Sequence, residues 1–407
     1  MPKSRDFFAE QLDKLQRGDL EIARLYLPAG ELPAVGSTLK NEDLAKSMEL
    51  LAAHGRDGFY RGPVAEAILR ASAAGGGLIA RRDLESYRAV IVEPVGIDFR
   101  GFRLLAAPPP TTGAAIFMPT MKALEEESFA GGPLRTAANL DRIGRIWRVV
   151  ASRVSRGIGD VEGARIFFEK LVGPDSINAI RDEATGRARA LSATSITEPP
   201  AVLGEEPMFY EDLAAATTHW LVADAAGNIV CATQSQSLHF GAGVVVPGTG
   251  IVMNNSMGNF AFNDRSSPNF VAPGKRSRST IAPTIVFRSG KPVFAIGLPG
   301  AARIPTAMLQ VLLDRLTLNR PLADAIGDTR FHFARATSES APDSFAAEKS
   351  LPETVAAAMS LLGWRVDLPE VAGQGRYFGG VNAIEFNPDG SMTGLADPRR
   401  TNAVEGF

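Results

Sequence analysis

Residues 214–237 carry the pattern that most restricts the fold of this chain. They read AAATTHWLVADAAGNIVCATQSQS. Apolar and polar residues alternate on both sides of the turn Ala226-Gly227-Asn228, which predicts two antiparallel strands. A second strand pair, with the turn Ser289-Gly290-Lys291, follows in APTIVFRSGKPVFAIGLPG, and RAVIVEPVGIDF (88–99) is strand-like.

Helical periodicity precedes and follows these strand pairs. A helix is expected to begin after Asn41, a good N-cap residue, and to end at Gly55. Apolar residues recur at helical spacing in four further segments, 62–77, 136–156, 303–316 and 351–364. Helices, then strand pairs, then helices predict a layered α+β fold.

Composition and motifs exclude several function classes. The net charge of −2 over 407 residues gives no attraction to nucleic acid or an anionic membrane. No stretch approaches the ~18 apolar residues of a membrane span, and the charged N-terminus predicts no signal peptide. The histidines His54, His219, His239 and His332 are too scattered to predict a zinc site. The single cysteine, Cys231, excludes an internal disulfide.

Hydroxyl side chains remain as candidates, since there is no phosphate-binding loop and no G-x-S-x-G motif. A threonine hydroxyl needs a base, and its own α-amino group serves when the threonine begins a chain. The pKa of such an amine, about 7.7–8.0, is close to neutral pH. Thr217 reaches that state if its hydroxyl attacks the carbonyl of Ala216 and water opens the ester. On strand propensity alone, Thr217-Thr218 is more often an ordinary strand start.

Longer blocks resemble the γ-glutamyltransferases, or glutathione hydrolases, which are N-terminal-nucleophile hydrolases. The blocks are TTHWLVADAAGNIV (217–230), FGAGVVVPGTGIVMNNSMGNF (240–260), GKRSRSTIAPTIV (274–286), GLPGAARI (297–304) and GLADPRR (394–400). Upstream, residues 43–68, 76–89 and 99–113 resemble the later part of the family's large subunit. The resemblance covers nearly the whole chain and implies a four-layer αββα sandwich.

The resemblance implies a role for four residues around the nucleophile. Thr217 matches the nucleophile and new N-terminus, and Thr218 follows it as in the family. Thr233 matches a threonine kept near the nucleophile. Ser235 occupies the position of a threonine that hydrogen-bonds the nucleophile, so the family's hydroxyl is retained there.

A second group matches the substrate site. Ser279 and Thr280 match a Ser-Ser pair that binds the substrate's α-carboxylate. Gly300 and Ala301 match a Gly-Gly pair whose backbone N–H groups form the oxyanion hole. Such a hole needs backbone donors, so Ala301 can serve if its φ is negative.

The substrate pocket also departs from the family. An acidic pair usually follows NN-x-M, and its second carboxylate binds the glutamyl α-ammonium; Gly258 and Asn259 stand there instead. An amide supplies no countercharge, and charge-assisted bonds are about twice as strong as neutral ones. Ser237 replaces an asparagine and Ser256 a polar amide. We therefore expect weak binding of an α-ammonium.

Nothing in residues 1–40 resembles the family's further N-terminal segment, which supplies strands and a carboxylate-binding arginine. The sandwich is therefore expected to be incomplete, with an unpaired strand edge near residues 219–236 or 284–297. Such an edge, with an apolar face, predicts a chain that self-associates or is marginally stable.

The resemblance also implies partners. Cleavage would give a large-subunit-like region, residues 1–216, and a small-subunit-like catalytic region, residues 217–407, which stay together as a heterodimer. Substrates would be γ-glutamyl compounds such as glutathione, with amino acids or water as acceptors. No metal or organic cofactor is implied, because the amine and the oxyanion hole suffice. Family members often lie in the periplasm or outside the cell, and the sequence leaves the compartment open.

Three functions stay open at this point. The first is a γ-glutamyltransferase or glutathione hydrolase that acts through an acyl ester on Thr217. The second is a related acylase or amidohydrolase for an acyl group without an α-amino group, which Asn259 favours. The third is an unprocessed relative that only binds.

Overall fold

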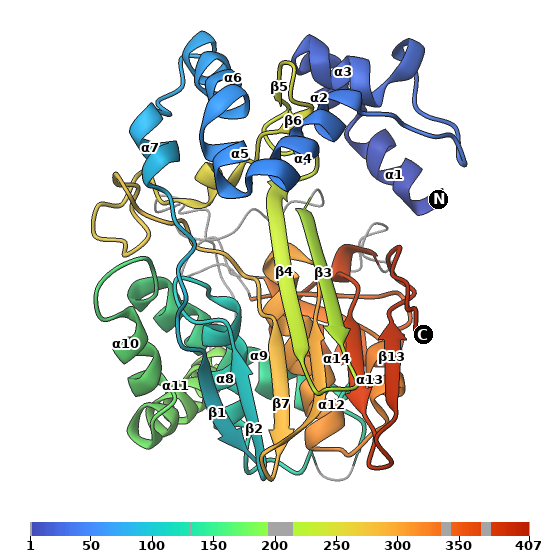
Figure 1. Cartoon of the computed structure of the whole chain (residues 1–407). Helices are drawn as coiled ribbons and strands as arrows, with labels where there is room; N and C mark the ends of the chain where they lie inside the picture. Colours follow the sequence, from blue (N-terminus) through green and yellow to red (C-terminus); the bar gives the residue numbers. More distant parts are fainter. Residues whose placement is uncertain (1, 130–131, 194–214, 335–342, 368–375, 407) are drawn as a thin grey trace. The chain divides into compact units, whose positions relative to one another are not determined.

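The computed structural model describes residues 2–129, 132–193, 215–334, 343–367 and 376–406 (Figure 1). Ala214, the first residue of the segment 214–237, lies outside them. The chain forms two compact units: Met1–Val92 with Ala214–Ala216 and Ser235–Ser256, and Glu93–Leu213 with Thr217–Gln234 and Met257–Phe407. These units are defined by packing, whereas the boundary predicted between residues 216 and 217 is a cleavage of the peptide bond. The cleavage stays a prediction.

The first unit is mostly helical, with a short two-stranded loop held against its helices. Its elements are α1 (Pro2–Glu10), α2 (Leu12–Arg17), α3 (Leu20–Tyr26), η1 (Pro28–Gly30), α4 (Glu42–His54), α5 (Arg56–Tyr60), α6 (Gly62–Ala74), α7 (Arg81–Ser86), β5 (Val245–Val246) and β6 (Ile251–Val252). Asp19 caps α3 and also accepts a hydrogen bond from the N–H of Val245. Asn41 caps α4, as predicted, and its amide donates to the carbonyl of Gly250. These side chains fix the loop that carries β5 and β6.

A six-stranded antiparallel sheet, in the order β1-β2-β7-β8-β12-β13, forms the centre of the second unit. Its strands are β1 (Val95–Phe99), β2 (Phe102–Ala106), β7 (Thr284–Arg288), β8 (Lys291–Gly297), β12 (Asn382–Phe386) and β13 (Met392–Ala396). The predicted pair around Ser289 and Gly290 is confirmed as β7 and β8, and both turn residues have positive φ. The strand predicted over residues 88–99 is shorter, since it begins only at Val95.

Helices cover one face of this sheet. The remaining elements are α8 (Gly113–Ala123), α9 (Ala137–Gly157), α10 (Ala164–Leu171), α11 (Pro174–Ala193), α12 (Ile304–Leu316), α13 (Leu322–Gly327), α14 (Glu353–Leu361), β9 (Phe331–Ala334), β10 (Ser344–Ala347) and β11 (Arg365–Asp367), with η3 (Ser256–Asn259), η4 (Ala301–Arg303) and η5 (Arg376–Phe378). Phe294 and Ile296 of β8 belong to the same buried core as Met308 and Leu312 of α12. No helix within the described ranges is both long and apolar enough to cross a membrane.

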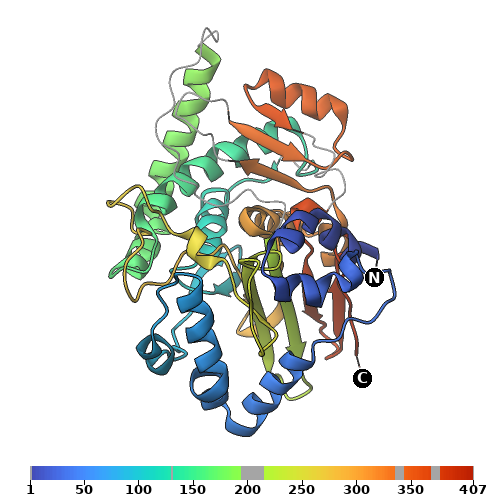
Figure 2. The same ribbon diagram turned by 90° about the horizontal axis from the view of Figure 1, so that it is seen from above.

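The predicted hairpin, β3 (Ala215–Ala223) and β4 (Ile229–Leu238), supplies the next layer of the second unit through residues 217–234 (Figure 1). Its inner side faces β7 and β8, because Sγ of Cys231 lies 3.6 Å from the carbonyl oxygens of both Thr284 and Ile296, to either of which the thiol can donate. Helices, six-stranded sheet and hairpin are thus successive layers of this unit, which Figure 2 shows from above.

The predicted unpaired edge is found only in part. β7 and β8 each have a neighbour on both sides, so the expectation for residues 284–297 is wrong. In the described part of the chain, β3 and β4 pair only with each other. The outer side of the hairpin exposes Trp220, Val222 and Val230, which agrees with the expectation for residues 219–236. The self-association inferred from it stays a prediction.

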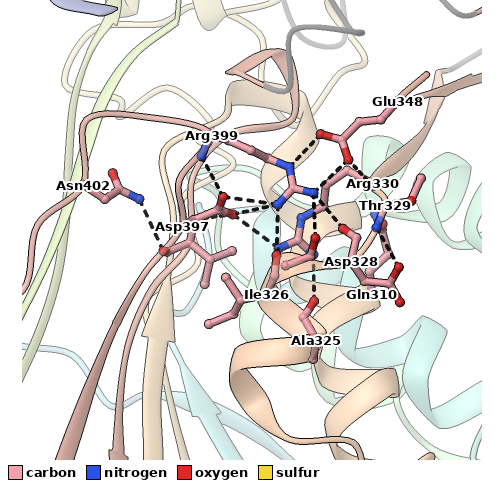
Figure 3. A network of polar contacts seen from close by, with 12 residues as sticks. Gln310, Ala325, Ile326, Asp328, Thr329, Arg330, Glu348, Asp397, Arg399 and Asn402 are labelled. Atoms are coloured by element: carbon pink, nitrogen blue, oxygen red, sulfur yellow. Dashed lines mark hydrogen bonds and ion pairs between the residues drawn. The ribbon is translucent and has the colours of Figure 1, made fainter. Parts of the chain in front are cut away.

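A buried ion-pair network holds the end of β13 to α13 and β10 (Figure 3). Arg399 pairs with both oxygens of Glu348, at 2.7 and 2.8 Å, and with Asp397. Arg330 donates to the carbonyl of Ile326 at 2.7 Å and to Asp397 at 3.4 Å. Burial lowers the pKa of Arg330 to about 10. The GLADPRR block that carried part of the resemblance therefore has a structural use in this chain.

Candidate active site

Thr217 lies near the start of β3 and is half-buried. Alternate residues of a strand face the same side, so Thr217 shares a side with His219. His219 is 3% exposed, whereas Thr218 and Trp220 are exposed on the other side. On the inner side of β3, the residue next to the candidate nucleophile Thr217 is therefore the buried His219.

His219 fastens β3 to the six-stranded sheet. Its backbone carbonyl accepts a hydrogen bond from the amide Nδ2 of Asn382 at 2.9 Å. Asn382 of β12 is the register partner of Gly297 of β8. A Cβ atom built on Gly297 would lie only 2.3 Å from Cε1 of His219. The imidazole of His219 therefore packs directly on Gly297 of the sheet. His219 is two residues after Thr217 in β3, so this contact lies close to the candidate nucleophile.

Both ring nitrogens of His219 have neighbours inside this pocket. Nδ1 lies 2.7 Å from Oγ1 of Thr233, and Nε2 lies 4.0 Å from Sγ of Cys231. Burial lowers the pKa of His219 to about 4 and raises that of Cys231 to about 12. At neutral pH the histidine is uncharged and the cysteine is a thiol. Thr233, predicted to lie near the nucleophile, contacts His219.

The two predicted substrate-site pairs meet in the second unit. The hydroxyl of Thr280 donates to the carbonyl of Ala301 at 2.8 Å, so the Ser279-Thr280 and Gly300-Ala301 segments are in contact. The carbonyl of Ser279 accepts from the N–H of Thr112 at 2.7 Å. A hydroxyl has a single hydrogen. Thr280 can therefore donate either to Ala301 or to a substrate carboxylate, but not to both at once.

Gly300 is the N-cap of η4 and Ala301 its first residue, just after the end of β8. The φ of Gly300 is 164°, which is extended, and the φ of Ala301 is 48°, in the left-handed region. The condition under which alanine was expected to serve in the oxyanion hole, a negative φ, is not met. The backbone keeps the conformation that suits glycine, although the residue is alanine. The role of Ala301 as an oxyanion donor stays a prediction.

Replacing Ala301 by glycine should stabilise the protein. The left-handed conformation costs a residue with a Cβ about 1–2 kcal/mol, and the extra entropy of glycine in the unfolded chain offsets about 0.4–1 kcal/mol of that. We expect the free energy of unfolding, measured in urea, to rise by up to about 1.5 kcal/mol. Ala302→Gly is the matched control, because Ala302 is buried and has no positive φ, and it should lower stability. If both substitutions destabilise alike, Ala301 is not strained.

Asn259 is joined to the Ser279 segment by a buried side chain that the sequence did not single out. The amide of Asn269 donates to the carbonyl of Asn259 at 2.6 Å and accepts from the N–H of Arg278 at 3.0 Å. The buried guanidinium of Arg278 donates to the carbonyls of Ser155 and Ile158, at the end of α9. No sequence motif points to Asn269, because its two hydrogen-bond partners, Asn259 and Arg278, are joined to it only by the way the loop folds.

The other predicted residues belong to the first unit. The hydroxyl of Ser235 donates to the carbonyl of Ala216 at 3.1 Å and accepts from the N–H of Ser237 at 2.9 Å. The N–H of Asn255 donates to the carbonyl of Gln236 at 2.9 Å, which places Ser256 beside this segment. The structure thus brings Ser235, Ser237 and Ser256 together in one unit, and Thr217, Thr233, Asn259, Ser279, Thr280, Gly300 and Ala301 lie in the other. Within the residues described, no cluster of three His, Cys, Asp or Glu side chains suits a metal ion.

Comparison with known proteins identifies the family. The family model described as gamma-glutamyltranspeptidase matches residues 1–407. The chain belongs to the gamma-glutamyltranspeptidase family. The resemblance read from the sequence blocks is therefore confirmed.

Curated relatives include enzymes of two names. The Acylase ACY 1 proenzyme of Pseudomonas sp. (strain SE83) is 32% identical over 93% of this chain and 63% of its own length. The Glutathione hydrolase proenzyme of Escherichia coli (strain K12) is 29% identical over 92% of this chain and 63% of its own length. The chain thus spans less than two thirds of the length of these relatives.

A solved structure confirms the fold class. Cephalosporin acylase from Bacillus halodurans superposes with a TM-score of 0.80 at 23% identity, over 100% of this chain and 70% of that one. At this identity the likeness establishes the fold and not the substrate. The chain has the α+β fold of the N-terminal-nucleophile hydrolases.

Proposed function

We propose that this family member cuts itself before Thr217 and then hydrolyses or transfers acyl groups through an ester on Thr217. The two products, residues 1–216 and 217–407, stay associated as one enzyme. The acyl donor is a γ-glutamyl compound of the glutathione type, and the acceptor is water or an amino acid.

The surroundings of His219 carry this proposal. To turn over substrate, a threonine inside a chain would take its base from a side chain, and histidine is the most common one. His219 faces the same side of β3 as Thr217, but its ring nitrogens lie against Thr233 and Cys231. The other histidine of this unit, His332, is buried and lies 2.8 Å from the hydroxyl of Thr306 through its Nδ1. Because neither histidine is placed to act as the base, we assign that role to the α-amino group that cleavage would create on Thr217.

The reaction then needs only groups of this chain. The amine of Thr217 takes the proton of its hydroxyl as Oγ1 attacks the acyl carbonyl. Backbone N–H groups of the Gly300-Ala301 turn are the proposed donors to the oxyanion. The leaving amine takes the proton from the α-ammonium, which leaves the acyl ester on Thr217. Water or an acceptor amine then attacks the ester by the reverse sequence of proton transfers.

A second candidate is an acylase for an acyl group without an α-ammonium. The observation that favours it is Asn259, a neutral amide at the position of the family's ammonium-binding carboxylate. Its backbone is held by Asn269, so its place beside the Ser279 segment is fixed. Relatives of both kinds, acylase and glutathione hydrolase, match this chain at similar identity.

Two anilide substrates separate these candidates, and Asn259→Asp tests the pocket. The variant should raise kcat/KM for a γ-glutamyl anilide, because a carboxylate gives the α-ammonium a countercharge. A bond to a charged group contributes about 1.5–3 kcal/mol, which corresponds to roughly one to two decades in rate. Turnover of a glutaryl anilide, which has no α-ammonium, is the control and should not rise.

The kcat/KM values of the wild-type protein for the two anilides decide between the candidates. A higher kcat/KM for the γ-glutamyl anilide supports the first, and a higher value for the glutaryl anilide supports the second. If Asn259→Asp leaves γ-glutamyl turnover unchanged or lower, Asn259 does not line the pocket. If wild-type protein turns over neither anilide and stays one chain, the proposed function is wrong.

A further inference from the structure

The hydroxyl of Ser235 lies on the carbonyl group that self-cleavage would attack. Its Oγ is 3.1 Å from the carbonyl oxygen of Ala216, and the bond predicted to break joins that carbonyl carbon to Thr217. Ser235 and Ala216 belong to the same unit. The family role implied by the sequence, a hydrogen bond to the nucleophile, does not account for this contact.

The hydroxyl of Ser235 is the donor in its contact with Ala216, and it also accepts a hydrogen bond. The backbone N–H of Ser237 donates to the same Oγ at 2.9 Å. A carbonyl oxygen only accepts, so the hydroxyl is the donor in its contact with Ala216, while the N–H of Ser237 meets a lone pair of the same Oγ. The serine is therefore set as a donor to Ala216.

The segment that holds Ser235 is anchored on its other side. The carbonyl of Gln236 accepts from the N–H of Asn255 at 2.9 Å, and the carboxamide oxygen of Asn254 accepts from the N–H of Ser256 at 2.9 Å. The end of β4 is thus bound to the loop 254–256. A donor fixed before the reaction stabilises charge without reorganising when the charge appears.

We propose that Ser235 stabilises the oxyanion that forms on Ala216 during self-cleavage. The inference rests on the proposed function, because it concerns the step that creates the mature enzyme. It assigns Ser235 to the carbonyl that is attacked. Ser235 thereby acts as a catalytic residue of maturation.

The step balances with groups of this chain and water. Oγ1 of Thr217 forms a bond to the carbonyl carbon of Ala216, and the carbonyl oxygen becomes an oxyanion that receives the Ser235 hydrogen bond. The C–N bond then breaks, and the proton lost from Oγ1 ends on the new α-amino group. Water opens the ester, which leaves a carboxylate on Ala216 and restores the hydroxyl of Thr217. As negative charge gathers on the oxygen, the bond from Ser235 becomes charge-assisted and strengthens.

A pulse of cell-free synthesis followed by a chase measures this step. The full chain of 43.3 kDa is followed on a denaturing gel as it converts to two fragments. Loss of one oxyanion donor typically slows a reaction by about 10²–10³-fold. Because Ser235 is exposed, we expect Ser235→Ala to slow conversion by about a hundredfold, at the lower end of that range.

Two further variants separate a chemical from a structural effect. Ser235→Thr keeps the hydroxyl and should convert within a few-fold of the wild-type rate. Gln236→Ala truncates the exposed side chain next to Ser235 and should convert at the wild-type rate. The melting temperature of Ser235→Ala should stay close to that of the wild type, because the lost side chain is exposed.

Each result has a defined meaning. Slow Ser235→Ala with fast Ser235→Thr and Gln236→Ala supports the proposal. Conversion of Ser235→Ala at the wild-type rate overturns it, as does a Ser235→Thr variant as slow as Ser235→Ala. A wild-type chain that never converts overturns the proposed function instead, so the two failures are distinguishable.

Discussion

Thr217→Ala should leave a single uncut chain of 43.3 kDa that turns over no substrate. The substitution removes the hydroxyl that attacks Ala216 and, in the mature enzyme, the hydroxyl that carries the acyl group. Loss of a nucleophile costs roughly 10⁴-fold or more in rate. A denaturing gel reports the cleavage, and anilide turnover reports the activity of the same sample.

Thr217→Ser is the matched control for this variant. It keeps a hydroxyl and, after cleavage, an α-amino group at the chain start, so it should still cut and should retain measurable turnover. Fragments of wild-type size from Thr217→Ala would mean that another group cuts the chain. Turnover by an uncut Thr217→Ala chain would mean that Thr217 is not the nucleophile.

Gly297→Ala should impair cleavage and turnover although Gly297 takes no part in the chemistry. The new methyl group would lie 2.3 Å from Cε1 of His219, closer than real Cβ contacts, so β3 must shift. Displacements of about 1 Å at a reacting group cost on the order of 10²-fold in rate. Overpacking also destabilises by about 1–3 kcal/mol. We expect slower self-cleavage, a lower kcat and a lower melting temperature.

Gly186→Ala is the control for this substitution. Gly186 lies in α11, and a methyl group there meets nothing within 4 Å. Helix propensity favours alanine there by about 1 kcal/mol, so cleavage and kcat should stay at the wild-type level while the melting temperature stays level or rises. If Gly297→Ala behaves like Gly186→Ala in both rates, His219 does not position Thr217.

The local parts of the fold could be predicted because their signals are local. Alternating residues and the Ser289-Gly290 turn identified β7 and β8, and Asn41 with Gly55 bounded α4. The strand expected over residues 88–99 was too long because Val90, Ile91 and Val92 satisfy a strand pattern. In the structure these side chains are exposed and belong to no described strand, which β propensity alone does not reveal.

The sequence predicted which residues belong to the candidate site, but not the contacts between them. The contact of His219 with Gly297 and Asn382 depends on the register of β8 against β12, which joins positions far apart in the chain. The bonds of Asn269 to Asn259 and Arg278 have no counterpart in any short pattern. The positive φ of Ala301 runs against the preference of alanine, so the condition that the sequence analysis set for this residue, a negative φ, could be checked only in the structure.

The sequence also suggested an unpaired edge in a strand that is fully paired. Only the order of the sheet places β7 beside β2 and β8 beside β12. β2 lies well over a hundred residues before β7, and the turns and loops between them carry no pairing signal. The hairpin, whose pairing is local, is the place where the expectation agrees with the structure.

Intact mass spectrometry of purified wild-type protein, with sequencing of any new N-terminus, tests the central claim most directly. The account predicts two polypeptides, residues 1–216 and 217–407, and a new chain that begins Thr217-Thr218-His219. A protein that remains one chain of 43.3 kDa after long incubation, yet turns over an anilide substrate, would contradict it.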